Sequence, residues 1–277
     1  MKITYTLWTW LMDEHNEWKP TSSNLKKNFE DSLREASDLG FKYFENFNLI
    51  VNLFEGADSE FDDLCAKYDM KFVNVYHYIR TDFDEDLALA KKCCEFLNKH
   101  DANLMNLQAP FTTTPRGERP TPEELEETIV KVNKINEVAQ DHGVTVCFHP
   151  HFGSTVHYEE DIDRALEGFD PSVKICLDTA HTRLAGMNVY DKIRELGDRI
   201  AYMHLKDVCD SKDFALADQM FRFKVLGMGT IDFAEVFKAL EDIKFDGYAC
   251  FEQDYQRVCN YETGMNARNY LHQIGRM

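Results

Sequence analysis

Four apolar runs in the second half of the sequence end in ionisable or metal-binding side chains. The first ends in His149 and His151, and the next three end in D-T-A-H at 178–181, H-L-K-D at 204–207 and E-Q-D at 252–254. If these ends meet, two carboxylates and one or two imidazoles converge, and without a cation the carboxylates would repel until one was protonated. This mixed donor set suits Mn²⁺, Co²⁺, Mg²⁺, Fe²⁺ or Zn²⁺, and ligand type alone does not select among them.

An alternation of short and long segments supplies the elements that would position these residues. Runs rich in β-branched and aromatic residues are followed by stretches with helical periodicity. Eight such units predict a closed α/β barrel of the (β/α)₈ type that spans residues 1–277 as one domain. An open doubly wound sheet is the alternative, but the glycine-rich turn typical of its first strand is missing. The expected strands start near Ile3, Tyr43, Lys71, Leu104, Val144, Val173, Ile200 and Tyr248, and the expected helices cover 24–39, 58–68, 85–100, 122–142, 159–167, 189–196, 233–243 and 262–274.

Helix-boundary residues support these ranges. Gly40 and Gly143 follow two expected helices at C′ positions, where glycine readily adopts a positive φ. Thr121 precedes a proline and is expected to cap the fourth helix, and Asp232 is expected to cap the seventh. Residues 112–122 are expected to form one long loop between a strand and a helix.

Side-chain alternation predicts what lies beneath the polar strand ends. In such a barrel the active site lies at the C-terminal ends of the strands, where the four polar segments would meet. Residues two apart on a strand share a face, which pairs Cys147 with His149, Cys176 with Asp178, Tyr202 with His204 and Cys250 with Glu252. We therefore expect a floor of buried, reduced thiols below the site. The 8 cysteines include no C-x-x-C pair, which argues against a disulfide or zinc framework.

Other candidate binding residues come from the first half of the chain. Trp8, His77 and Gln108 lie at or near expected strand ends, among aromatic residues that would form a platform for the apolar face of a sugar or cyclitol ring. Packing beneath the loops is the alternative role for these aromatic residues. Glu45 ends the second expected strand, either as a substrate-binding group or as the partner of a nearby lysine or arginine.

Composition excludes several classes of partner. The formal charge of −18, from 31 Lys+Arg against 49 Asp+Glu, argues against a nucleic-acid partner, which needs a basic surface. The sequence contains no run of about 20 apolar residues, so we expect no membrane span. The N-terminus resembles the start of a strand and has no signal-peptide pattern, so a cytoplasmic location is expected.

The polar segments resemble those of a known family. The motifs H-P-H-F-G-S at 149–154, D-P-S-V-K-I-C-L-D-T-A-H at 170–181 and D-R-I-A-Y-M-H-L-K-D-V at 198–208 are similar to those of the xylose isomerase-like TIM barrels. This group includes sugar phosphate isomerases and epimerases and endonuclease IV, and within it the stretch 149–208 looks most like the inosose dehydratases. The resemblance covers nearly the whole chain.

The resemblance implies a divalent metal held by residues that end strands five to eight. Asp178, His204 and Glu252 match three of these positions. The family usually has glutamate on strand five, where this chain has His149. Ketose 3-epimerases of the group use two glutamates as opposed proton-transfer residues, so the substitution weakens an epimerase assignment and resembles the dehydratase branch.

The reaction that the resemblance implies is enolisation of a keto-sugar or keto-cyclitol. His149 or His151 is expected to be the base, with Glu252 as the alternative, and His181 is expected to be the acid. Lys206 either steadies a substrate oxygen or pairs with Asp207. An inosose-dehydratase-like lyase is the favoured activity, which would belong to inositol catabolism.

Other activities are compatible with the same residues. A sugar isomerase or epimerase, or a lyase that cleaves a 3-keto-glycoside, would use the same metal site. A catalytically inactive carbohydrate-binding barrel would respond little to chelators, and a nuclease is disfavoured by the charge. The family resemblance also makes a homo-oligomer a reasonable expectation.

Overall fold

Eight parallel strands close into a barrel in the computed structural model, which describes residues 1–11, 24–80, 82–114, 118–210, 222–254 and 259–277. Around the barrel the strands follow the order β1-β10-β7-β6-β5-β4-β3-β2, so sequence neighbours are spatial neighbours. The (β/α)₈ fold expected from the sequence is therefore confirmed. The strands are β1 (Lys2–Thr6), β2 (Tyr43–Phe47), β3 (Lys71–Tyr78), β4 (Leu104–Gln108), β5 (Thr145–His149), β6 (Lys174–Asp178), β7 (Ile200–Leu205) and β10 (Tyr248–Phe251).

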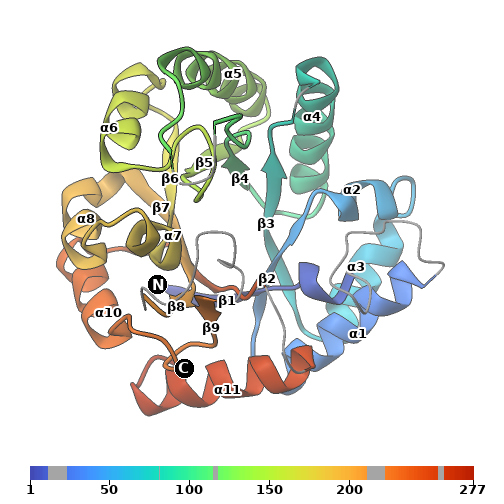
Figure 1. The fold of residues 1–277 in the computed structure, drawn as a ribbon. Coiled ribbons are helices and arrows are strands. Elements are labelled where there is room, and N and C mark those ends of the chain that lie inside the picture. The colour runs from blue at the N-terminus through green and yellow to red at the C-terminus, as the bar shows by residue number, and fades with distance from the viewer. Residues whose placement is uncertain (12–23, 81, 115–117, 211–221, 255–258) are drawn as a thin grey trace.

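Helices form a ring around the strands, as Figure 1 shows. The described part of the chain contains none long and apolar enough to cross a membrane. The α-helices are α1 (Leu25–Asp38), α2 (Leu49–Leu53), α3 (Asp58–Lys67), α4 (Phe83–Lys99), α5 (Pro122–Asp141), α6 (Glu159–Gly168), α7 (Thr179–Leu184), α8 (Val189–Leu196), α10 (Phe233–Asp242) and α11 (Asn260–Gln273), and the 3₁₀ helices are η1 (Trp8–Leu11) and η2 (Gly197–Arg199).

The main hydrophobic core lies between the outer face of the barrel and the helices. Parallel strands are covered on both faces, so their outward side chains are as apolar as their inward ones. On one side, Phe29 of α1 and Phe61 of α3 pack against Phe44 of β2, with ring centroids 5.6–6.3 Å apart. The inner face is different, because polar side chains occupy much of it near the C-terminal strand ends.

The expected helix boundaries are confirmed by their capping contacts. Gly40 and Gly143 have φ values of 88° and 67°. The Thr121 side chain accepts a hydrogen bond from the Glu124 backbone N–H at 3.2 Å, and the Glu124 carboxylate accepts one from the Thr121 N–H at 2.9 Å. Asp232 caps α10 by accepting from the N–H groups of its first turn.

Five short elements were not expected from the sequence. They are η1, η2, α2, α7 and a two-stranded antiparallel sheet of β8 (Asp207–Val208) and β9 (Phe223–Lys224). Helices of five or six residues show too few turns for a helical period, and the β8–β9 pair joins segments 15 or more residues apart. In the expected loop 112–122, Thr112 and Thr113 donate hydrogen bonds of 2.7–2.9 Å to Glu124 of α5, and 115–117 lie outside the described residues.

Candidate metal centre

The inner face of the barrel carries two stacked layers from strands β5, β6, β7 and β10. The lower layer is a buried cluster of Cys147, Cys176, Tyr202 and Cys250 with Val73. The upper layer consists of the residues two positions further on, His149, Asp178, His204 and Glu252, all buried. Strand register supports this arrangement, since Asp178 lies opposite His204 on the neighbouring strand. The thiol floor expected from the sequence is confirmed.

Three potential ligand atoms converge in the upper layer. Asp178 Oδ2, His204 Nδ1 and Glu252 Oε2 all lie within 4.8 Å of one another. Nδ1 of His204 is 2.8 Å from the Glu252 oxygen and 4.0 Å from the Asp178 oxygen. Each atom is buried and has no hydrogen bond of acceptable geometry among the described residues, although the Lys206 ammonium lies 2.9 Å from the Glu252 oxygen and 3.3 Å from the Asp178 oxygen. Buried polar atoms without hydrogen bonds are costly, so this donor set fits a divalent cation with mixed nitrogen and oxygen ligands.

Asp178 is positioned by helix α7. Its other oxygen, Oδ1, caps α7 by accepting a hydrogen bond from the His181 backbone N–H at 2.8 Å. The strand therefore ends and the helix begins at the same aspartate, which explains the close spacing of the D-T-A-H segment. The cap fixes one carboxylate oxygen and leaves Oδ2 directed at the convergent group.

His149 lies beside this group and is a candidate fourth ligand. Its Nδ1 is 3.2 Å from the Cys176 carbonyl oxygen, to which an N–H at that position donates. This leaves the lone pair on Nε2. The ring centroids of His149 and His204 are 4.9 Å apart, and His149 also forms a potential donor set with Asp178 and His181.

Glu45 contacts the opposite edge of the His204 ring. The Glu45 carboxylate is 3.0 Å from His204 Nε2, and it accepts a hydrogen bond from Asn106 Nδ2 at 3.0 Å. The predicted pairing of Glu45 with a lysine or arginine is wrong. Glu45 lies in the middle of β2 and faces the barrel interior, where it is fully buried. Its partner is the candidate metal ligand itself.

Lys206 lies directly above His204 and contacts three carboxylates. Its Nζ is 2.9 Å from Glu252 Oε2, 3.3 Å from Asp178 Oδ2 and 2.8 Å from Asp254 Oδ1. The ammonium is buried. Its backbone is fixed by Thr179 of α7, whose hydroxyl donates to the Lys206 carbonyl at 2.7 Å and accepts from its N–H at 3.0 Å.

The alternative pairing of Lys206 with Asp207 is wrong. Neighbouring residues on a strand point to opposite faces, and the Asp207 carboxylate turns away from the mouth. It accepts hydrogen bonds of 2.8–3.2 Å from the backbone N–H groups of Val208, Gly227, Gly229 and Ile231.

Two further histidines form the rim above His149. The rings of His151 and His181 have centroids 3.9 Å apart, and together with Asp254 they offer another set of potential metal donors. His151 Nδ1 is 2.9 Å from the Phe152 carbonyl oxygen, so an N–H there donates and the lone pair is on Nε2. His181 Nδ1 faces the Phe152 N–H at 3.4 Å, and its Nε2 faces Lys206 Nζ at 3.4 Å.

Burial and charge set the protonation of these groups. Burial lowers the pKa of His151 to about 3, with a further contribution from the Lys206 ammonium, and it lowers the pKa of His149 and His181 well below the usual range. Burial alone would lower the pKa of Lys206, but Asp178, Asp254 and Glu252 raise it well above its ordinary value. At neutral pH the three histidines are therefore neutral bases, and Lys206 is charged.

An aromatic stack forms one wall of the mouth. Trp8 stacks on Phe47 at 4.8 Å, Phe47 on Tyr76 at 4.7 Å, and Tyr76 on His204 at 5.9 Å between centroids. Gln108 belongs to the same wall, since its Oε1 accepts a hydrogen bond from the Tyr76 hydroxyl at 2.6 Å. The structure thus connects Gln108 to His204 through Tyr76, and Trp8 through Phe47 and Tyr76.

His77 does not join this group. Its side chain is fully buried, and its Nδ1 is 2.8 Å from Asn48 Nδ2. The residue alternates with Tyr76, so it points toward the helices rather than into the barrel. The sequence indicates that His77 lies near the end of a strand. It does not show which face of the strand His77 occupies, because the register between β2 and β3 is irregular.

Sequence analysis gave no role to three residues that shape the site: Asn106, Thr179 and Asp254. Asn106 and Asp254 each lie two positions from a residue that was singled out, Gln108 and Glu252 respectively, and therefore share its face. That alternation was the available signal. Thr179 acts through backbone contacts with a distant strand, for which the sequence offers no signal.

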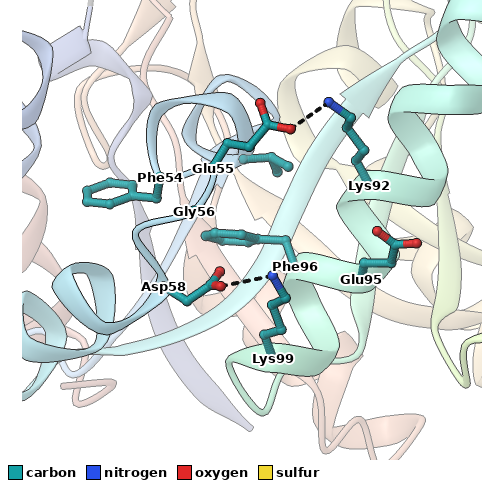
Figure 2. Close-up of a pocket in the computed structure, with 9 residues that line it drawn as sticks. Phe54, Glu55, Gly56, Asp58, Lys92, Glu95, Phe96 and Lys99 are labelled. Carbon is teal, nitrogen blue, oxygen red and sulfur yellow. Dashed lines mark hydrogen bonds and ion pairs between the residues drawn. The ribbon is translucent and has the colours of Figure 1, made fainter.

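A separate groove lies on the outer wall between α2 and α4 (Figure 2). Phe54 and Phe96 line it, and two ion pairs cross it, Glu55 with Lys92 at 3.0 Å and Asp58 with Lys99 at 2.9 Å. The lysines are already paired with carboxylates, and the groove is on the helical layer rather than at the strand ends. It therefore adds nothing to the chemistry of the mouth.

The fold and the donor set together define a (β/α)₈ barrel with a buried candidate site for a divalent metal at its C-terminal mouth. The comparison with protein families is consistent with this geometry. The model of the xylose isomerase-like TIM barrels matches residues 33–271. This chain belongs to that family.

Related proteins support the assignment. An inosose dehydratase from Bacillus licheniformis is 31% identical over 264 residues, which cover 91% of this chain and 80% of the relative. An inosose dehydratase from Geobacillus kaustophilus is 26% identical over 266 residues, covering 87% and 86%.

Solved structures share the fold at lower identity. The IolI protein, in a structure with a bound zinc atom, superposes with a TM-score of 0.77 at 17% identity, covering 99% of this chain and 98% of IolI. The probable 3-DHS dehydratase AsbF from Bacillus anthracis gives a TM-score of 0.76 at 17% identity, covering 98% and 99%. At these identities the superpositions establish the fold alone.

Proposed function

We propose that this chain is a divalent-metal-dependent dehydratase of a keto-cyclitol, the reaction class for which its inosose dehydratase relatives are named. The observation that carries the proposal is the convergence of three buried donor atoms, on Asp178, His204 and Glu252, that lack hydrogen bonds among the described residues. His149 would complete the ligand set. A cation held there would supply Lewis-acid polarisation of a substrate carbonyl.

The protein's own groups provide a base beside the ligands. His151 keeps its proton on Nδ1, where it donates to the Phe152 carbonyl, so the lone pair on Nε2 is available to take the proton α to the substrate carbonyl. His149 presents its Nε2 in the same way and is the alternative base if it does not ligate the cation.

His181 is the proposed acid. Both of its ring nitrogens face donors, the Phe152 N–H and the Lys206 ammonium, each at 3.4 Å. A neutral imidazole carries one N–H, and the carboxylate oxygen nearest to Nε2 is Asp178 Oδ2 at 3.8 Å, beyond hydrogen-bond distance. Because a neutral imidazole is a weak acid, His181 would protonate a departing β-hydroxyl only after taking a proton from the Lys206 ammonium beside it. Lys206, with Asp254, would hold a substrate oxygen beside it.

The charge of the cluster favours an uncharged substrate. Among the described residues of this cluster, Asp178, Glu252 and Asp254 share the Lys206 ammonium, and Glu45 contacts the His204 ring instead. A divalent cation would bring the cluster close to neutrality. A keto-cyclitol or free keto-sugar then meets less repulsion than a sugar phosphate would. The stacked Trp8, Phe47 and Tyr76 rings offer an apolar wall for such a ring.

The test is incubation of the Mn²⁺- or Co²⁺-loaded protein with inososes, free keto-sugars and a phosphorylated ketose in D₂O. We expect loss of water from an inosose and deuterium at the α-carbon of the recovered substrate. Deuterium exchange with inversion and without loss of water would instead identify an epimerase. Full metal occupancy with no exchange on any keto compound would contradict the enolising mechanism.

A further inference from the structure

Lys206 shares its contacts with the candidate metal. The two oxygens that Lys206 Nζ approaches at 2.9 and 3.3 Å, on Glu252 and Asp178, are the same oxygens that converge with His204 Nδ1. An ammonium and a divalent cation cannot both occupy these oxygens at contact distance without strong repulsion, because the charges would lie only a few ångströms apart in a buried site.

Asp254 offers the ammonium a partner outside the metal-binding oxygens. Its Oδ1 is 2.8 Å from Nζ, and the residue belongs to the donor set with His151 and His181 rather than to that of Asp178, His204 and Glu252. The backbone of Lys206 is held by Thr179, so the side chain has to adjust by rotation about its own bonds. Rotation toward Asp254 would free both metal-binding oxygens.

We propose that Lys206 is an internal competitor of the divalent cation, and that Asp254 is the carboxylate onto which its ammonium withdraws when the cation binds. This inference rests on the proposed metal site and concerns its affinity. The ammonium neutralises the carboxylates while the site holds no cation, so folding does not depend on metal. It also weakens cation binding and permits exchange, while Asp254 limits that penalty.

The chain contains a matched control in Lys192. This lysine is equally buried and also contacts three carboxylates, those of Glu159, Asp163 and Glu195 at 3.0–3.5 Å, but it is on α8 in the outer layer. Replacing either lysine by methionine removes one buried positive charge, although the carboxylates around Lys192 are about half exposed and those around Lys206 are buried. Only Lys206 shares carboxylates with the metal centre.

The experiment measures Mn²⁺ and Co²⁺ affinity by competition with a chelating dye, without substrate, for wild type, Lys206→Met, Asp254→Asn, the double variant and Lys192→Met. We expect Lys206→Met to bind the cation about tenfold more tightly or better and Lys192→Met to bind as wild type does. Asp254→Asn should bind more weakly, because the ammonium then has only the metal-binding carboxylates as partners. In the double variant the Asp254 effect should disappear.

Three outcomes overturn the proposal. They are unchanged or weaker binding in Lys206→Met, an equal gain in Lys192→Met, and an Asp254→Asn effect of the same size in both backgrounds, which would mean that Asp254 acts through its own charge. If Lys206→Met does not fold by circular dichroism, Lys206→Gln and the single Asp254→Asn variant provide the same test. Because the readout is cation affinity, a protein that binds metal as expected but exchanges no substrate proton would refute only the proposed function.

Discussion

His204 is contacted on both ring nitrogens by carboxylates from opposite sides of the barrel. Glu252 approaches Nδ1, and Glu45 approaches Nε2. An imidazole that binds a cation through Nδ1 must carry its proton on Nε2, and a carboxylate at Nε2 fixes that tautomer and makes the ligand more basic. We therefore propose that Glu45 positions His204 as a ligand, and its expected role as a substrate-binding group stays a prediction.

The first prediction follows from this contact. Glu45→Gln keeps the size of the side chain but removes the charge that faces His204 Nε2. We expect the affinity for Mn²⁺ or Co²⁺ to fall by about tenfold to a hundredfold, the usual cost of losing such a partner. Competition with a chelating dye measures the change. Glu35→Gln is the control, because Glu35 accepts a hydrogen bond from Trp10 Nε1 at 2.9 Å outside the mouth. Equal losses in both variants would mean a general effect on folding.

The second prediction concerns His77 and the stability of the fold toward acid. Burial lowers the pKa of His77 to about 4, whereas an unfolded chain has a histidine pKa of about 6.5. Between these values the unfolded state binds a proton that the folded state does not. The contribution of His77 to stability is therefore complete above pH 6.5 and is lost as the pH falls toward 4.

The variant that tests this is His77→Asn, which retains an acceptor for Asn48 Nδ2. We expect the loss of unfolding free energy between pH 7 and pH 4 to be smaller in the variant by up to about 3 kcal/mol. Urea unfolding at several pH values measures it. A variant whose stability declines with acid as steeply as that of the wild type would show that His77 does not titrate in this way.

At the scale of elements, the repeating units could be predicted and the short insertions could not. Each long helix and each barrel strand has its own period, and all eight expected strands start within two residues of their observed positions. The same alternation placed Cys176 below Asp178 and Cys250 below Glu252. It could not reveal that Glu45 reaches across the barrel to His204, or that Lys206 meets Asp254, because those contacts depend on barrel closure and on the stagger of distant strands.

The β8–β9 sheet gives the third prediction. A Cβ added at Gly229 would lie 2.2 Å from Asp207 Oδ1 and 2.6 Å from the Val208 carbonyl oxygen, so the Gly229→Ala variant must displace the carboxylate that binds the loop after β9. We expect a loss of about 1–3 kcal/mol in unfolding free energy. Urea unfolding of Gly229→Ala and of Met228→Ala measures it. The exposed Met228 side chain should cost less than about 0.5 kcal/mol, and equal costs would contradict the close contact.

At the scale of the whole molecule, an acidic protein carries a buried group of carboxylates at its mouth. The chain has a formal charge of −18, and the described mouth residues add to the local excess of negative charge. Self-repulsion of this kind disfavours the compact state. Any cation that binds the folded site and not the unfolded chain therefore stabilises the entire barrel.

The fourth prediction is that this linkage is measurable as a shift in thermal midpoint. Mn²⁺ or Co²⁺ at about 100 times its dissociation constant should add about 2.7 kcal/mol, which corresponds to a rise of about 5–10 °C for a chain of this size. EDTA should reverse the rise, and Asp178→Asn should abolish it while Mg²⁺ and ionic strength are held constant. The wild-type protein should still fold in EDTA, because Lys206 neutralises the carboxylates. A thermal midpoint that neither the cation nor the chelator changes would mean that the three converging donor atoms hold no metal. The barrel would then be a candidate for carbohydrate binding without catalysis.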